Sequence, residues 1–297
     1  MIIGTRGSEL ARTQANTVAA ALKKKMGVAA QVKIISTQGD RVTDRPLREL
    51  EGRGYFTKEI EDALLGRTVD IAVHSFKDMP SKAPDGLAVS AVSEREDPAD
   101  LIIIRSEAYD ESAGEIPVRS GATVGTSAVR REAQLRALRP DVKSKDLRGN
   151  VPTRVTKLAN GQYDAIFLAS AGVRRLELDL SKFEVVRLDP ARFVPSPGQG
   201  ALAIQMRKDD PRFADVHQAL NDELTATATT IEREVQRLFG GGCSLPLGVF
   251  ARMEDGYWQV SGFWEDAERG ALAAHLGGEY PDGLGTQLFD RLSRKAG

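Results

Sequence analysis

Cysteine is almost missing from this sequence, because Cys243 is the only one among 297 residues. A single thiol cannot form a disulfide within the chain, and the start MIIGTRGSEL lacks the apolar core of a secretory signal, so we expect a cytoplasmic protein. Histidine is also scarce, and only His217 and His275 lie in the same half of the chain as Cys243. A metal site at this thiol would need more ligands, so none is expected.

Long hydrophobic runs and a large net charge are absent as well. The longest aliphatic run, residues 101–104, is far too short to cross a bilayer, so no membrane role is expected. The net charge of −1 argues against a general nucleic-acid-binding protein. The bases are nevertheless concentrated, since residues 129–157 contain nine Lys or Arg against three Asp or Glu. This segment is a candidate anion-binding site.

Short apolar stretches alternate with helical patterns over roughly the first 210 residues, beginning with a strand at 2–5 and a helix at 7–26. This alternation is typical of parallel βαβ units. The pattern then changes to one long helical stretch over 211–239, followed by short strands and a terminal helix. The chain also exceeds the usual size of a single core, so we expect an α/β part followed by a distinct α+β unit.

The stretch DIAVHSFKDMP, residues 70–80, ends an apolar strand with Lys77 and Asp78 side by side. Ligands of open α/β sheets bind at the carboxyl ends of the strands, so both residues are candidates for a binding or catalytic site. A solvated Lys–Asp pair on a surface turn is the alternative interpretation. His74 lies inside the apolar part of the strand, which favours a hydrogen-bonded core histidine over a catalytic base.

Three loops lead from a strand into the start of a helix and carry arginines: GTRGSELA at 4–11, VGTSAVRREAQL at 124–135 and LRGNVPTRVTKL at 147–158. Helix starts offer free N–H groups and a positive dipole end, which suit carboxylate or phosphate. Arginine adds planar forks that bind carboxylates through two bonds. The loops lack nucleotide-binding glycine patterns, so they predict a polyanionic ligand of another kind. A solvated helix face is the alternative, and it suits Arg136 and Arg139.

Cys243 stands in LFGGGCSLPLG, behind three glycines and ahead of a Leu-Pro turn. A lone cysteine is commonly a small buried hydrophobe, but flanking glycines leave a thiol accessible at a cost in backbone entropy. A cysteine nucleophile would need an orienting acid and an oxyanion loop, and neither is evident beside it. A thiol that serves as an attachment point needs neither. All three interpretations stay open at this stage.

Nine motifs stand in order along residues 2–250: TRGSELA, GYFTKEIEDALL, DIAVHSFKDMP, EREDP, GTSAVRREAQL, LRGNVPTR, YDAIFLASAGVRRL, PGQGALAI and GGGCSLPLG. In this order they closely resemble the porphobilinogen deaminase, or hydroxymethylbilane synthase, family. The resemblance implies a transferase that condenses four porphobilinogen molecules head to tail, releases ammonia at each step and forms 1-hydroxymethylbilane. It also implies a primer, a dipyrromethane cofactor held by a thioether to a cysteine that matches Cys243.

The resemblance also implies roles for single residues. Asp78 matches the catalytic acid of the family. Each pyrrole carries an acetate and a propionate, which accounts for the many arginines among the expected binding residues. By similarity, the residues that bind cofactor and substrate are Arg6, Ser8, Phe56, Ser75, Lys77, Thr126, Ser127, Arg130, Arg131, Arg148, Gly149, Arg154, Arg175 and Gln199.

The implied fold is α/β, with two domains of the type II periplasmic-binding-protein kind and a small α+β C-terminal domain. The boundaries expected here are 1–93 with 196–215 for the first domain, 96–195 for the second, and 218–297 for the third. The polar stretch at 38–53 matches a mobile loop over the active site in the family.

The stretch at 105–121 is longer than the family pattern and is predicted to be a surface elaboration. We expect a monomer that binds porphobilinogen and has no nucleic-acid or membrane partner. A non-catalytic anion-binding protein of the periplasmic-binding kind is the alternative function, and a cysteine hydrolase is the second.

Overall fold

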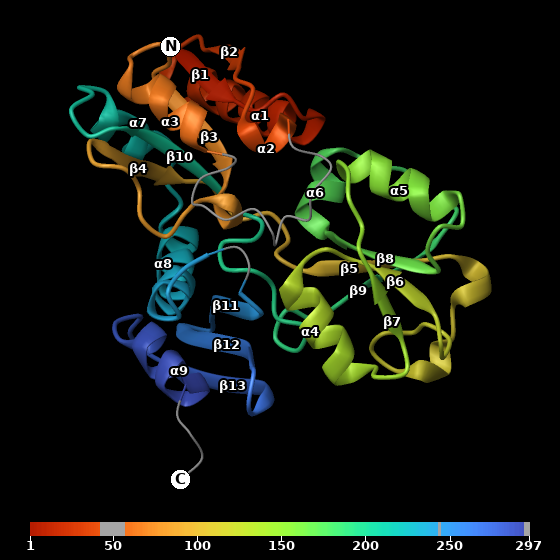
Figure 1. Cartoon of the computed structure of the whole chain (residues 1–297). Helices are drawn as coiled ribbons and strands as arrows, with labels where there is room; N and C mark the ends of the chain where they lie inside the picture. Colours follow the sequence, from red (N-terminus) through yellow and green to blue (C-terminus); the bar gives the residue numbers. More distant parts are fainter. Residues whose placement is uncertain (42–56, 243–244, 294–297) are drawn as a thin grey trace.

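The computed structural model describes residues 1–41, 57–242 and 245–293. Within this part of the chain there are three β-sheets, each with its own hydrophobic core (Figure 1). The two larger sheets stand side by side, and the third lies below the first in the view of Figure 1.

The first sheet combines the N-terminal strands with one strand from much later in the chain. In spatial order its strands are β2 (Gln31–Ile34), β1 (Ile2–Thr5), β3 (Ile71–Ser75), β10 (Leu202–Arg207) and β4 (Leu87–Val92). β1 runs parallel to β2 and β3, whereas β10 is antiparallel to β3 and β4. The chain therefore leaves this sheet after β4 and returns to it in β10.

The helices associated with the first sheet are α1 (Glu9–Met26), α2 (Gln38–Arg41), α3 (Lys58–Leu65) and α7 (Phe213–Leu220). The hydroxyl of Ser8 caps α1 by accepting a hydrogen bond from the Ala11 N–H at 3.2 Å. Val18 and Leu22 of α1 are buried in the core of this sheet, as the helical spacing of apolar residues predicts. The cap and the buried face together fix where α1 begins and which side of it packs.

The second sheet repeats the arrangement of the first. Its strands in spatial order are β7 (Lys143–Lys145), β6 (Thr123–Gly125), β8 (Ala165–Ala169), β5 (Asp100–Ile104) and β9 (Glu184–Arg187). Here β6 is parallel to β7 and β8, and β5 is the antiparallel strand. Its helices are α4 (Val129–Leu138), α5 (Val151–Ala159) and α6 (Ser170–Arg175). Both sheets thus have the strand order expected for a type II periplasmic-binding fold, and the predicted fold class is confirmed.

The third sheet is an antiparallel meander at the C-terminal end of the described chain. It consists of β11 (Leu247–Glu254), β12 (Tyr257–Asp266) and β13 (Gly270–Gly278), and it packs with α8 (Glu223–Leu238) and α9 (Leu284–Ser293). Val235, Val249 and Leu288 are fully buried in the core between them. Among the described helices, none is long and apolar enough to cross a membrane.

The single helix predicted over 211–239 is wrong, because the structure has two helices there. The break falls between α7 and α8, where Asp222 accepts a hydrogen bond from the Thr225 N–H at 2.8 Å and begins α8. Asn221 and Asp222 both bond to the backbone of Val92 at the end of β4. The periodicity of the apolar residues continues across the break, which is why the pattern alone suggested one helix.

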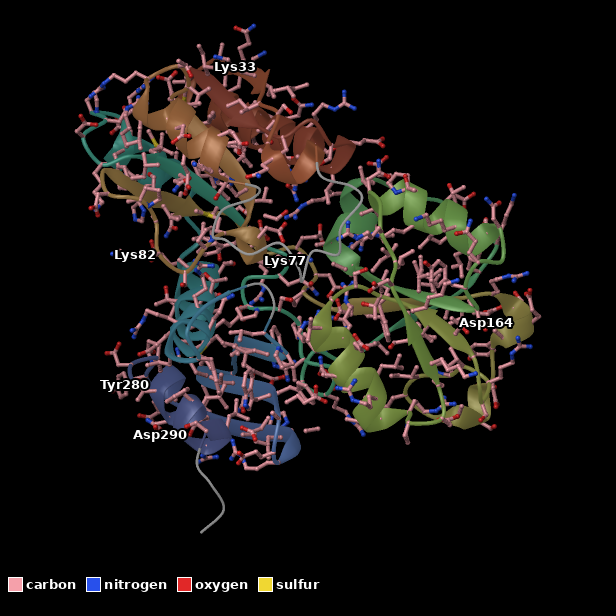
Figure 2. All side chains as sticks on the ribbon, viewed as in Figure 1. Lys33, Lys77, Lys82, Asp164, Tyr280 and Asp290 are labelled. Carbon is pink, nitrogen blue, oxygen red and sulfur yellow. The ribbon has the colours of Figure 1, made fainter. Side chains whose placement is uncertain are left out.

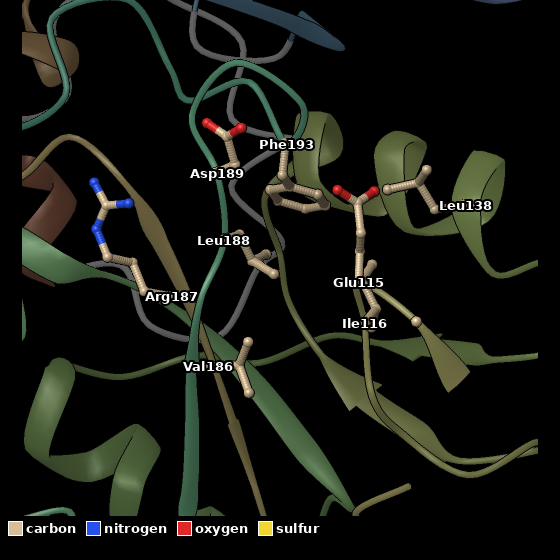
Figure 3. A pocket seen from close by; sticks show the side chains of 9 residues that line it. Glu115, Ile116, Leu138, Val186, Arg187, Leu188, Asp189 and Phe193 are labelled. Atoms are coloured by element: carbon tan, nitrogen blue, oxygen red, sulfur yellow. The ribbon is translucent and has the colours of Figure 1, made fainter. Parts of the chain in front are cut away.

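The surface elaboration predicted at 105–121 is also wrong in part. Ala108, Ile116 and Val118 are buried in the core of the second sheet. Ile116 and Phe193 line a cavity of about 270 Å³ together with Glu115 and Asp189 (Figure 3). The segment is polar in composition, but its few apolar side chains complete one end of the core.

A chain of buried polar side chains crosses the first sheet. His74 Nε2 lies 3.1 Å from Gln205 Oε1, and Gln205 Nε2 donates to Glu61 Oε1 at 2.9 Å. All three residues are buried. Burial lowers the pKa of His74 to about 4, although the hydrogen bond to Gln205 acts in the opposite direction. His74 is therefore a neutral core histidine.

The burial of His74 makes the stability of the protein depend on pH. Between pH 6.5 and pH 4 the unfolded chain binds a proton at this histidine that the folded chain excludes, so stability falls as the pH falls. We predict that from pH 7 to pH 5 the free energy of unfolding of the wild type falls by about 2 kcal/mol more than that of His74→Gln. Urea unfolding at both pH values measures this difference. Equal losses in the two proteins would contradict it.

Candidate active site

The first part of the site is a tight turn at the end of β3. Phe76–Asp78 form one turn of 3-10 helix, and the Phe76 N–H donates to the Ala201 carbonyl at 3.0 Å. Just before it, the side chains of Ser75 and Gln14 hydrogen-bond each other at 2.9 Å. Asp78 is exposed, while Lys77 is partly buried. We call residues 76–80 the catalytic turn.

Lys77 connects this turn to the segment through which the chain returns from β9 to β10. Its Nζ donates to Gln199 Oε1 at 3.0 Å, and Figure 2 labels it at the junction of the two larger units. Burial lowers the pKa of Lys77 to about 8, and the neighbouring charge of Asp78 acts against this shift. Arg131, from the second unit, lowers the same pKa further. The turn therefore lies within electrostatic range of Arg130 and Arg131, which were predicted from the sequence to bind anions.

A fully buried carboxylate, Asp100 at the start of β5, holds the two central arginines. Its Oδ2 lies 2.8 Å from Arg130 Nη2 and its Oδ1 lies 2.7 Å from Arg131 Nη2. Gln199 Nε2 donates to Oδ1 at 2.9 Å. Burial alone would raise the pKa of Asp100, but the two guanidinium charges outweigh it and hold this pKa well below its usual range. We call Asp100, Arg130, Arg131 and Gln199 the Asp100 cluster.

The solvated-face interpretation does not apply to Arg130 and Arg131, because only 3% and 6% of their surfaces are exposed. Arg130 Nη1 donates to the Val194 carbonyl at 2.8 Å, and Arg131 Nη1 donates to the Phe167 carbonyl at 3.2 Å. Arg131 Nε is also buried, and among the described residues it has no hydrogen-bond partner. Two cations share one carboxylate, so the cluster keeps a net positive charge and an unused donor, as a carboxylate-binding site requires.

The two arginine-bearing loops of the second unit are joined to each other. Ser127 Oγ donates to the Leu147 carbonyl at 2.9 Å and accepts from the Leu147 N–H at 3.0 Å. In the first loop, the Thr126 hydroxyl accepts from the Ala128 N–H at 3.2 Å. In the second loop, Gly149 has φ of +112°, a conformation that side chains disfavour. The two helix starts thus form one continuous wall.

Arg154, on α5, points from this wall toward the catalytic turn. Its Nε donates to the Gly149 carbonyl at 2.8 Å. Burial lowers the pKa of Arg154 to about 10, Arg131 and Arg148 lower it as well, and the Asp78 carboxylate opposes them. Arg154 therefore lies within electrostatic range of Asp78 of the first unit and of Arg131 and Arg148 of its own unit.

The remaining described candidates make contacts of their own. Arg175 Nη2 donates to the Gly200 carbonyl at 2.7 Å, and burial lowers the pKa of this arginine. Arg6 is partly buried, and its charge contributes to the lowered pKa of His74. Ser8 caps α1, so its hydroxyl already serves the helix start. No group of three or more metal-ligating side chains occurs in the described part of the chain.

Phe56, Cys243 and most of the predicted lid at 38–53 lie outside the described residues. The glycines that lead to Cys243 are described, and Gly240, Gly241 and Gly242 have φ values of +92°, +69° and +124°. Three successive residues in this region of φ explain why the sequence uses glycine here. α8 therefore ends in a left-handed turn that leads directly to the cysteine.

Glu232 on α8 is a second buried carboxylate, and the sequence pattern did not indicate it. It forms an ion pair with Arg95, 2.7 Å between Oε1 and Nη1, and accepts from the N–H groups of Gly198 and Ala251 at 2.7 and 2.9 Å. These partners belong to both connections between the larger sheets and to the third sheet. Asp100 was missed as well, although it stands in the sequence as an acid directly before an aliphatic strand, which is a usable signal of a paired buried charge.

Comparison with known proteins gives the following matches. Residues 1–215 match a family model described as porphobilinogen deaminase, dipyromethane cofactor binding domain. Porphobilinogen deaminase of Syntrophobacter fumaroxidans is 44% identical over 261 residues, covering 88% of this chain and 82% of that protein. That of Chromobacterium violaceum is 40% identical over 296 residues, covering 98% and 94%. An ancestral cationic amino acid solute-binding protein is 16% identical with a TM-score of 0.45, covering 74% of this chain and 87% of that one.

The Asp100 cluster predicts a large effect of one neutral substitution. Asp100→Asn would leave Arg130 and Arg131 buried without a counter-ion, so we expect it to lower the free energy of unfolding by about 3–5 kcal/mol. Urea unfolding measures this loss. Asp209→Asn is the control, because the Asp209–Arg67 ion pair is exposed on both sides and should contribute little. A loss for Asp100→Asn no larger than that of the control would contradict the role given to the cluster.

Proposed function

The chain belongs to the porphobilinogen deaminase family, and from this premise we propose how its own residues perform the reaction. The enzyme is a transferase that joins four porphobilinogen molecules head to tail, with loss of one ammonia at each step, to give 1-hydroxymethylbilane. It uses a covalently held dipyrromethane primer. We propose Asp78 as the catalytic carboxylate and the arginines of the second unit as the groups that bind the pyrrole carboxylates.

One observation carries this proposal: the Asp78 carboxylate of the first unit lies within electrostatic range of Arg154 of the second, whose pKa Arg131 and Arg148 also lower. Every pyrrole unit has an acetate and a propionate, so the bound chain is a polycarboxylate. Planar guanidinium groups suit that ligand. An exposed carboxylate among them suits a reaction in which positive charge develops next to bound carboxylates.

The described residues fit the dipyrromethane group. Arg131 Nε is buried with no hydrogen-bond partner in the described part of the chain, and the glycine turn after α8 leads to the attachment residue Cys243. We propose that Lys77, Ser127, Arg131 and Arg154 hold the carboxylates of the cofactor. When bound, dipyrromethane supplies the pyrrole carbon to which the first substrate unit is joined.

Asp78 acts on the substrate. The aminomethyl group of porphobilinogen is protonated, its C–N bond breaks with loss of ammonia, and the remaining substrate fragment is a cation conjugated with its pyrrole ring. The methylene carbon of this cation then bonds to a pyrrole α-carbon, which releases its proton. Asp78 accepts a hydrogen bond from the pyrrole N–H and stabilises this cation. Because the carboxylate is exposed on a tight turn, it can serve each incoming unit in succession.

Lys77 and Gln199 position the cleft wall beside Asp78. Gln199 accepts from Lys77 and donates to Asp100, so the turn of the first unit and the arginines of the second share one hydrogen-bonded chain. This arrangement keeps the Lys77 ammonium directed along the cleft. Ser75, Arg6, Ser8, Thr126, Gly149 and Arg175 are proposed as further contacts at its edges, and Phe56 as a packing surface for a pyrrole ring.

The division of the chain is part of the proposal. We assign residues 1–93 with 196–215 to a first domain, 96–195 to a second and 218–297 to a third that carries Cys243. The polar segment at 38–53 is proposed as a lid over the cleft. The proposal also includes a cytoplasmic, monomeric protein without a nucleic-acid partner, in keeping with a single cysteine and a net charge near zero.

Intact-protein mass spectrometry tests the proposed function. The purified wild type should exceed its sequence mass by one dipyrromethane, and Cys243→Ala should show the sequence mass alone. Denaturation before the measurement removes any ligand that is not covalently bound. If the wild type has only the sequence mass and gains none on incubation with porphobilinogen, the transferase proposal fails and a non-catalytic anion-binding protein is favoured.

A further inference from the structure

Arg233 is a half-buried residue of α8, and its side chain reaches the catalytic turn. Its Nη1 donates to the carbonyls of Phe76 and Met79 at 3.3 and 3.2 Å, and its Nη2 donates to the Pro80 carbonyl at 2.6 Å. The guanidinium carbon also lies 4.5 Å from the centre of the Phe76 ring. Figure 1 shows α8 running between the first sheet and the third, which places its side chains within reach of both.

The three carbonyls that Arg233 binds flank Asp78 in the sequence, because Phe76 precedes it and Met79 and Pro80 follow it. Phe76 and Met79 are also joined by the internal bond of the turn, from the Met79 N–H to the Phe76 carbonyl at 3.2 Å. One planar guanidinium thus fixes the residues before and after Asp78 in a single geometry. A lysine has a point charge in place of a fork and could not hold all three acceptors in this arrangement.

The same helix holds the loop that leads to Cys243. The Gly241 N–H donates to the Gln236 carbonyl at 2.9 Å, and a Cβ added at Gly241 would lie 2.5 Å from Ser81 Oγ. The glycine turn therefore packs directly against the residue that follows the catalytic turn. This contact is independent of Arg233, and it joins the same two segments.

Neighbouring residues of α8 hold neighbouring parts of the cleft. Glu232 accepts from the Gly198 N–H, and Arg233 binds the catalytic turn. Gly198 itself packs on that turn, since a Cβ added at Gly198 would lie 3.3 Å from the backbone nitrogen of Lys77. α8 consequently contacts the catalytic turn, the return connection at Gly198 and the glycine turn at residues 240–242.

We propose that Arg233 is a positioning residue that sets the location of Asp78 relative to the glycine turn at residues 240–242. This inference rests on the proposed function, because it takes Asp78 as the catalytic carboxylate and Cys243 as the attachment point. Arg233 is outside the set of substrate-binding arginines, and it contacts the turn through three backbone carbonyls and the Phe76 ring. The other contacts that hold the turn include its covalent link to β3, the Phe76 N–H bond to Ala201 and the Lys77 side chain.

Steady-state kinetics of Arg233→Met tests this role, because methionine keeps much of the side-chain length and removes all three hydrogen bonds. We expect the variant to retain the dipyrromethane mass and its KM within about threefold, while kcat falls by about 10- to 100-fold, since small misplacements of a catalytic group have effects of this size. Arg233→Lys should recover part of the loss. Arg237→Met, an exposed arginine one turn further along α8, is the matched control and should change kcat by less than about twofold.

A double-mutant cycle with Asp78→Asn separates positioning from general damage to the fold. If Arg233 acts through Asp78, adding Arg233→Met to Asp78→Asn should lower the remaining rate by less than about twofold. Equal fractional losses in both backgrounds, or an unchanged kcat in Arg233→Met, would overturn the inference. If Arg233→Met does not fold, the same cycle with Arg233→Lys decides between these outcomes. A wild type without the cofactor mass, or an Asp78→Asn variant with normal turnover, would instead refute the proposed function.

Discussion

The Asp100 carboxylate forms the interaction on which the rest of the cleft depends. It lies at the start of β5, fully buried, between Arg130 and Arg131. Without it, two guanidinium groups at one helix start would stand next to each other in a medium of low dielectric constant, where like charges repel strongly. With it, the pair is fixed in orientation and keeps one positive charge in excess. A cationic surface that is rigid before its ligand arrives avoids the cost of ordering flexible side chains on binding.

The two larger units meet through a small set of buried polar contacts near both chain crossings. Gln199, on the return connection, bridges Lys77 of the first unit and Asp100 of the second. Glu232 joins Arg95, on the outgoing connection, to Gly198 and to the third sheet. These carboxylates and amides bind partners from different units, so the same contacts fix the relative placement of the units. The turn that carries Asp78 and the arginines of the second unit consequently belong to different units but share one network.

Much of the fold and of the candidate site could be predicted from residue patterns. The apolar strands, the helix starts and the Lys77–Asp78 pair at a strand end are local features, and local features are visible in a sequence. The sequence singled out Arg130 and Arg131 as a pair, and it marks Asp100 as an acid before an aliphatic strand, but it does not show that these residues are partners. The pairing joins residues far apart in the chain, and only the fold of the second unit brings Asp100 at the start of β5 next to the arginines at the start of α4. The same reason hides the Glu232–Arg95 pair and the contact of Arg233 with the catalytic turn. The break between α7 and α8 was missed because a helix cap competes with an uninterrupted apolar period, and the cap prevailed.

We propose that the protein holds a growing polycarboxylate that stays covalently attached to it. Mass spectra of the denatured holoenzyme, taken shortly after mixing with a limited amount of porphobilinogen, test this proposal. We expect a series of protein masses, each heavier than the last by one porphobilinogen less one ammonia, with released ammonia equal to the units added. Ammonia release with no change in the protein mass would contradict it.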